Sequence, residues 1–126
     1  MKQPVSTQGA PAPIGPYSQG IVASGKLLFV SGQTPKDPKT GQMPTDITAQ
    51  TERCLESVKA IVEAAGASLA DVVKVSAYLA NMADFAAFNE VYGRYFPKPY
   101  PARTTISAVL PGANVMVEVD AIVALP

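Results

Sequence analysis

The C-terminal part of the chain reads PARTTISAVL at residues 101–110, PG at 111–112 and VMVEVDAIV at 115–123. Two apolar segments around a Pro-Gly turn predict two β-strands. Simple hairpin register, with Leu110 opposite Val115, would place Arg103 opposite Ile122. Arg103 and Glu118 each put one charge into this apolar pattern, and an unpaired charge in an apolar site costs several kcal/mol. Such charges are usually paired, exposed or functional, so both residues are candidates for a site.

The composition predicts one compact domain spanning residues 1–126. The chain is 48% hydrophobic, and its 126 residues suffice for one core but not for two. Ten Lys and Arg residues balance ten Asp and Glu residues, so we expect no nucleic-acid partner. No apolar run approaches the roughly 20 residues that span a bilayer, so no membrane association is expected. The single cysteine, Cys54, and an N-terminal segment without an apolar core indicate a cytoplasmic location.

The chain contains no histidine. This absence removes the commonest general base and the commonest metal ligand together. We therefore expect neither a metal site nor metal-dependent chemistry. Acid–base catalysis would fall to Glu, Asp, Lys or Tyr, or to a water molecule that one of them orients.

The remaining pattern predicts an α+β domain of order β-β-α-β-α-β-β, with the helices on one face of a sheet. Residues 4–16 are rich in proline and glycine and predict an irregular lead-in. Strands are expected at 18–23 and 26–31 around the Ser24-Gly25 turn, and at 71–79. Helices are expected from about Asp46 to Gly66 and from about Asp84 to Pro97. Cys54 lies on the apolar stripe of the first helix, which favours a core residue over a reactive thiol.

Two strands carry more apolar surface than one core needs. In the last strand the odd positions are all apolar, and the even positions combine Met116 and Ile122 with two acids. In the strand at 26–31 both alternating pairs are apolar, and we take Leu28 and Val30 as the pair surplus to the core. This pattern predicts a homo-oligomer that buries the face of the sheet without helices.

The chemistry of the two charged residues leaves alternatives open. The planar fork of Arg103 suits a carboxylate or a phosphate, but an ion pair within the chain would explain it equally well. Glu118 lies between Val117 and Val119, so it projects away from the core, where it could act as a general base. A solvated or salt-bridged acid is the simpler interpretation of Glu118, and a structural ion pair is the simpler one for Asp120.

Six motifs taken together resemble one known family. They are IGPYSQ at 14–19, SGQ at 31–33 with Pro35, DPKTG at 37–41, FNEVY at 88–92, PART at 101–104 and VEVDA at 117–121. Over nearly its whole length the chain resembles the Rid family, also called YjgF-type reactive intermediate deaminases. The resemblance implies a chorismate-mutase-like fold and a homotrimer, with a central barrel and three ligand clefts between subunits.

The resemblance also implies an activity. Rid deaminases hydrolyse 2-aminoacrylate-type enamines and 2-imino acids, such as 2-iminobutanoate and 2-iminopropanoate, to 2-oxo acids and ammonia without a cofactor. By motif, Arg103 would bind the substrate carboxylate and Glu118 would orient or activate water. Tyr17, Ser31, Gly32 and Asn89 would line the cleft. Thr105 stands where many relatives have cysteine, so no thiol is required; its backbone would still offer groups to the ligand.

Three other classes of function compete with deamination. A non-catalytic module that binds a 2-oxo acid would need Arg103 but not Glu118. A ribonuclease or translation inhibitor would need a basic groove, which the balanced charge does not predict. A mutase acting on a dianionic substrate would need more than one cationic contact.

Overall fold

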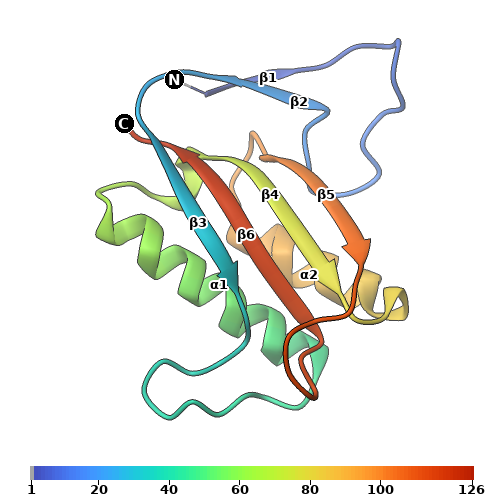
Figure 1. Ribbon diagram of the computed structural model, residues 1–126. Coiled ribbons are helices and arrows are strands. Elements are labelled where there is room, and N and C mark those ends of the chain that lie inside the picture. The colour runs from blue at the N-terminus through green and yellow to red at the C-terminus, as the bar shows by residue number, and fades with distance from the viewer. Residues whose placement is uncertain (1) are drawn as a thin grey trace.

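The computed structural model describes residues 2–126, and only Met1 of the predicted domain lies outside it. Its elements are β1 (Lys2–Val5), β2 (Gly20–Ala23), β3 (Leu27–Gln33), α1 (Ile47–Ala64), β4 (Val72–Leu79), α2 (Phe85–Tyr95), β5 (Ala102–Ser107) and β6 (Val117–Ala124). The main sheet has the order β3-β6-β4-β5, and both helices cover the same face of it (Figure 1). The predicted α+β class, with helices on one face, is confirmed.

The last two strands are not neighbours, so the predicted hairpin is wrong. β4 lies between them, antiparallel to β6 and parallel to β5. Ile122 pairs with Lys74 of β4, and Arg103 pairs with Val75 of the same strand. Parallel neighbours need a long crossover, and α2 supplies it between β4 and β5. The chain then passes from β5 across the end of β4 before it enters β6, which a local turn signal cannot reveal.

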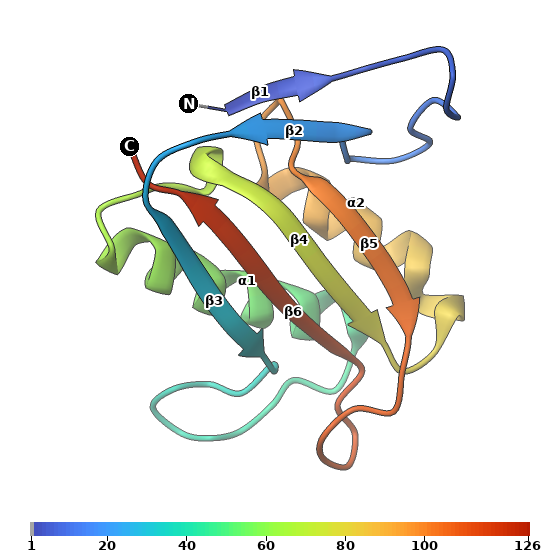
Figure 2. The same ribbon diagram turned by 45° about the horizontal axis from the view of Figure 1, so that its top comes forward.

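The N-terminal segment forms a second sheet. β1 pairs with β2 in antiparallel register, from Lys2 opposite Ala23 to Val5 opposite Gly20. Figure 2 shows this two-stranded sheet lying across one end of the main sheet. The strand expected at 18–23 therefore exists in shortened form, but it does not pair with β3 across the Ser24-Gly25 turn. Instead Gly25, with φ +102, lets the chain pass from one sheet into the other.

The helices begin and end where the sequence predicts. Asp46 caps α1 through its Oδ1, which accepts a hydrogen bond from the Ala49 N–H at 2.8 Å. Gly66, with φ +82, follows the C-terminus of α1. Cys54 of α1 is fully buried, and burial raises the pKa of its thiol to about 12, which confirms it as a core residue. The core lies between the helices and the sheet.

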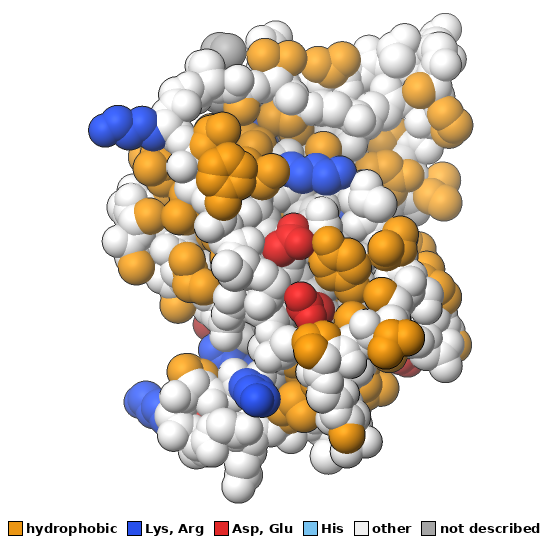
Figure 3. Space-filling view, in the orientation of Figure 1, with side chains coloured by type: hydrophobic (Ala, Val, Ile, Leu, Met, Phe, Trp, Pro, Cys, Tyr) orange, Lys and Arg blue, Asp and Glu red, His pale blue; other side chains and the backbone are white. Residues whose placement is uncertain are grey.

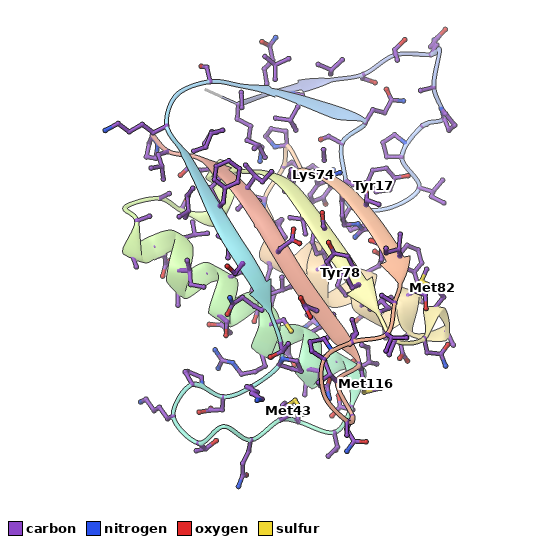
Figure 4. The ribbon with its side chains drawn as sticks, viewed as in Figure 1. Tyr17, Met43, Lys74, Tyr78, Met82 and Met116 are labelled. Carbon is purple, nitrogen blue, oxygen red and sulfur yellow. The ribbon has the colours of Figure 1, made fainter. Side chains whose placement is uncertain are left out.

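The other face of the main sheet is open. Val30 is 4% exposed on the helix side, whereas Phe29 is 69% exposed on the open side. The surplus apolar pair is therefore Leu27 and Phe29, and the assignment of Leu28 and Val30 to that face was wrong. Figure 3 shows acidic side chains in the middle of the open face with apolar side chains around them. Figure 4 shows Lys74 and Tyr78 projecting from β4 on this side.

Among residues 2–126, no helix combines the length and hydrophobicity that a membrane crossing requires. The fold offers two surfaces where a site could lie: the outer edge of the sheet at β5, and the open face around β6.

Candidate functional site

Arg103 is a residue of β5, the edge strand of the main sheet, and its side chain lies against α2. It pairs with Val75, whose side chain is buried under the helices, so Arg103 also projects to the helix side. Four aromatic rings surround its guanidinium carbon, with centroid distances of 5.5 Å to Tyr17, 5.7 Å to Phe85, 5.6 Å to Phe88 and 4.7 Å to Tyr92. Rings within about 6 Å stabilise a cation through their negative faces. The charge therefore lies in an aromatic enclosure.

The guanidinium has no acidic partner. Burial lowers the pKa of Arg103, and the phenols of Tyr92 and Tyr17 oppose that shift; no carboxylate among residues 2–126 contributes. Its Nη1 is buried and has no hydrogen-bond partner within residues 2–126. The intrachain ion pair considered from the sequence is thus not formed. A buried cationic donor left without a partner is suited to an anionic ligand.

A cavity of about 220 Å³ opens beside Arg103 and is lined by Tyr17, Phe85, Arg103 and Thr105. Backbone and side-chain bonds of Ser18 hold Tyr17 at this cavity. The Ser18 N–H donates to the Pro101 carbonyl at 3.1 Å, and its hydroxyl donates to the Tyr100 carbonyl. Ser18 also forms a parallel bridge with Ala102, next to Arg103. Residues 17 and 103 are therefore brought together by the backbone of a segment distant in sequence.

Asn89 joins the same group from α2. The Asn89 Nδ2 and Arg103 Nη2 lie 3.6 and 3.7 Å from where a β-carbon on Gly15 would stand, so both flank the Gly15 backbone. Asn89 Oδ1 and Thr105 Oγ1 are buried without partners among residues 2–126, like Arg103 Nη1. Buried polar atoms are nearly always hydrogen-bonded in native proteins, so this group of unpartnered atoms could hydrogen-bond to a polar ligand or to water. We call Tyr17, Asn89, Arg103 and Thr105 the guanidinium half.

Glu118 belongs to a different group of residues. It lies on β6, pairs with Tyr78 and projects from the open face. The β3–β6 pairing shifts register between Val30 and Gln33, which leaves one extra residue in β3 beside Glu118. A β-carbon on Gly32 would overlap Glu118 Oε2 and lie 3.0 Å from its Cδ, so the carboxylate lies directly over the Gly32 backbone. Ser31 is exposed in the same bulge. We call Ser31, Gly32 and Glu118 the carboxylate half.

The two halves do not meet within one chain. Arg103 projects to the helix side of the sheet and Glu118 to the open side, with β4 between their strands. The predicted hairpin register makes a direct contact between Arg103 and Glu118 within one chain doubtful, and the structure shows no such contact. The reason differs from the predicted one, because the two side chains lie on opposite faces of the sheet. One ligand can touch both only if a second copy of the chain supplies one half.

The carboxylate half opens into a cavity of about 350 Å³ lined by Tyr78, Ala108, Val109, Leu110, Pro111, Glu118 and Asp120. The Tyr78 hydroxyl donates to Asp120 Oδ2 at 3.1 Å, which gives Asp120 a hydrogen bond in place of the expected ion pair. Larger hollows of about 430 and 720 Å³ lie elsewhere and contain no residue of either half. Figure 4 labels Met43 and Met116, which line the larger of these two. Among residues 2–126, no group of three or more His, Cys, Asp or Glu residues could hold a metal ion.

Comparison with known proteins identifies the family. A family model described as endoribonuclease L-PSP matches residues 7–125. The chain belongs to this family, the Rid or YjgF-type proteins. A RutC family protein of Pyrococcus horikoshii is 51% identical, and the match covers 97% of both chains. A 2-iminobutanoate/2-iminopropanoate deaminase of Escherichia coli is 41% identical, again over 97% of both.

A solved Rid structure agrees with the fold. The crystal structure of Escherichia coli TdcF with bound serine superimposes with a TM-score of 0.77 at 40% identity, covering 98% of this chain and 99% of that one. The resemblance inferred from the six motifs is therefore confirmed at the level of family and fold.

The sequence did not indicate the aromatic enclosure. Phe85, Phe88 and Tyr92 lie in the helix expected from about Asp84 to Pro97, and their contact with Arg103 depends on β5 being the edge strand next to that helix. The one available signal was the density of aromatic residues on a single helix stripe.

Proposed function

We propose that this Rid protein hydrolyses 2-imino acids, and the 2-aminoacrylate-type enamines from which they form, to 2-oxo acids and ammonia. The buried Nη1 of the half-buried Arg103, which has no hydrogen-bond partner among residues 2–126, is the observation that carries the proposal. The name of the Escherichia coli relative, 2-iminobutanoate/2-iminopropanoate deaminase, supports the same substrate class.

Arg103 binds the substrate carboxylate. Its planar fork can donate two parallel hydrogen bonds to a carboxylate, a geometry that fixes orientation as well as position. Asn89 and Thr105 supply further polar atoms beside the fork, and Tyr17 and Phe85 supply apolar walls. A small acid with a short side chain suits this cavity, which offers one cation and few other polar groups.

Glu118 comes from a neighbouring subunit. Since it lies on the opposite face from Arg103, a complete site requires two copies of the chain. The open face also exposes Leu27, Phe29 and Ile106, at 49, 69 and 48%, which favours burial against another copy. We propose a homotrimer with one site at each interface, where the guanidinium half of one subunit faces the carboxylate half of the next.

The reaction needs few catalytic groups, because an imine is already electrophilic. A water molecule held by Glu118 attacks the carbon of the protonated imine and passes one proton to the carboxylate, which leaves a neutral carbinolamine. Glu118 returns that proton to the nitrogen, the C–N bond breaks and ammonia leaves. As the C=O bond forms, the hydroxyl proton passes to the Glu118 carboxylate and from there to the departing ammonia. A positioned general base of this kind adds about 10²–10⁴-fold to the rate. Arg103 holds the substrate in place throughout.

The test couples a pyridoxal-phosphate-dependent serine or threonine dehydratase to this protein and follows imine decay and ammonia release. The wild-type protein is expected to accelerate decay, Arg103→Ala to abolish the acceleration, and Glu118→Ala to reduce it by orders of magnitude. Glu118→Gln is the matched variant, because it keeps the shape and removes the base. Wild-type rates from a folded Arg103→Ala protein would overturn the assignment. Full activity in Glu118→Ala would show that Glu118 is not the catalytic base. If wild type does not accelerate imine decay, the protein is a carboxylate-binding module and not a deaminase.

A further inference from the structure

The positive charge of Arg103 is neutralised in an unusual way. A buried guanidinium usually pairs with a carboxylate, which occupies its N–H donors. Here four ring faces surround the cation, and Nη1 has no partner among residues 2–126. An aromatic ring attracts the cation electrostatically and, unlike a carboxylate, does not occupy its N–H donors with strong hydrogen bonds. The enclosure thus stabilises the cation without competing for the ligand.

Tyr92 is the ring best placed to do this. At 4.7 Å its centroid lies nearest to the guanidinium carbon of the four. It is fully buried and packs against two other rings, with centroid distances of 5.6 Å to Phe88 of α2 and 4.5 Å to Phe96, which follows α2. These close-packed neighbours restrict the position of the Tyr92 ring, and the ring in turn limits where the guanidinium can lie.

Packing alone does not require a tyrosine at position 92, because a phenylalanine ring would fill the same space. The hydroxyl of Tyr92 is buried without a partner among residues 2–126, although leaving a buried polar group unpaired is unfavourable. Burial raises the pKa of Tyr92 and the charge of Arg103 opposes that shift, so the phenol stays neutral near Arg103. The contact that the structure gives between Tyr92 and Arg103 is the one through the ring.

We infer that Tyr92 is a positioning residue for Arg103: its fixed ring holds the guanidinium in the orientation that presents both N–H groups to the substrate carboxylate. This inference rests on the proposed function of Arg103 as the carboxylate binder. Tyr92 does not touch the reacting atoms, so its effect is on substrate binding and much less on the chemical step.

The test weakens the negative potential of the ring face in steps while the shape of the ring stays nearly constant. Position 92 is changed to phenylalanine and then to mono-, di- and trifluorophenylalanine, which progressively weaken the negative face of the ring. Binding of pyruvate, as a 2-oxo acid probe, is measured by titration calorimetry together with KM and kcat for imine hydrolysis. The affinity is expected to fall stepwise with fluorination, by about 2- to 30-fold in total, with KM rising in parallel and kcat nearly constant.

Val62→Ala is the control. Val62 is fully buried on α1, and it belongs neither to the rings around Arg103 nor to either half of the site. This variant should lose stability while keeping pyruvate affinity. A spectroscopic readout on ligand-free protein adds a second measurement: the Nε–Hε signal of Arg103, assigned by its absence in Arg103→Lys, should be sharp in wild type and broaden as fluorination increases.

The outcomes separate the two proposals. If wild type neither binds pyruvate nor accelerates imine decay, the proposed function fails. If wild type does both and Arg103→Ala does neither, but affinity is the same across the fluorinated series, Tyr92 is only a packing residue and the inference is overturned.

Discussion

The guanidinium half and the carboxylate half differ in how the fold holds them. Arg103 is enclosed by four rings, and its neighbours Asn89 and Thr105 keep buried polar atoms free. Glu118 lies on an open sheet face, over the backbone of a glycine in a β-bulge. The first half lies within one chain around the buried Nη1 of Arg103, whereas the second contains a half-buried carboxylate on the opposite face of the sheet. The proposed function therefore places substrate binding within one subunit and makes hydrolysis depend on a second copy of the chain.

Loss of the Arg103 guanidinium should cause the largest loss of binding and activity. Arg103→Ala is expected to abolish both pyruvate binding and hydrolysis, because the other polar groups of this half carry no positive charge. Arg103→Lys keeps the charge but not the bidentate geometry, so it should recover only a small part of the activity. Calorimetry and the coupled assay give both quantities. Equal activity in Arg103→Lys and wild type would show that a point charge is sufficient.

Gly32→Ala should disable the carboxylate half without unfolding the protein. The new β-carbon would overlap Glu118 Oε2 and displace the carboxylate, a flexible group that can move at little energetic cost. We expect a loss in kcat towards the value of a site without its base, about 10²–10⁴-fold, with nearly unchanged pyruvate affinity.

Gly9→Ala provides the control for that experiment, because a β-carbon there would meet only Thr7 Oγ1 at an ordinary 3.5 Å. Its activity should equal that of wild type. A Gly32→Ala protein with wild-type kcat would contradict the placement of the base.

Thr105→Val tests the buried hydroxyl of the guanidinium half. The change keeps the shape and removes an unpartnered Oγ1, so the free energy of unfolding should rise by about 1 kcal/mol while KM rises a few-fold. Urea unfolding and the coupled assay measure the two effects. Thr105→Ser restores the hydroxyl and should return KM towards wild type. If Thr105→Val lowers stability, the hydroxyl has a partner in the ligand-free protein.

The smallest predicted effect is the influence of Glu118 on the pKa of Cys54, which links this thiol to the carboxylate half. Burial, and to a smaller extent the charge of Glu118, raises the pKa of this thiol from 9.0 to about 12. Because the unfolded thiol ionises first, the free energy of unfolding should be highest below about pH 9. It should then fall by up to ~1.4 kcal/mol per pH unit as the pH rises through 12.

Urea unfolding between pH 8 and 11 measures this fall. Glu118→Gln should make the fall that begins near pH 9 slightly shallower, and Arg103→Lys should not change it. Cys54→Ser, the control, should remove this part of the fall, while the part above about pH 10 remains because the pKa values of Tyr92 and Tyr95 are also raised. An effect of Arg103→Lys as large as that of Glu118→Gln would contradict the separation of the two halves.

Much of the fold follows from the sequence, because periodicity and capping are local. Asp46 and Gly66 mark the ends of α1, and α2 lies within the range expected for the second helix. The partner of β5 could not be predicted, since the choice between β4 and β6 depends on the path of the chain around α2. Gln50 gave no signal either, yet it is buried and bonds to Pro44, Asn114 and Met116, holding two loops together.

The sequence is sufficient to name candidate site residues but not to predict their geometry. Arg103 and Glu118 were recognisable as charges in apolar strands, and the family motifs added the residues around them. Strand alternation alone could not show that the two side chains lie on opposite faces, because that relation depends on the register of both strands against β4.

The most direct test of this account mixes two inactive proteins. Arg103→Ala subunits retain the carboxylate half, and Glu118→Ala subunits retain the guanidinium half. If each site combines halves from two subunits, co-refolded equal mixtures should regain about a quarter of wild-type imine hydrolysis, because random assembly pairs two intact halves at one site in four. If both residues act from the same chain, the mixture will remain as inactive as its components, and the account will be wrong.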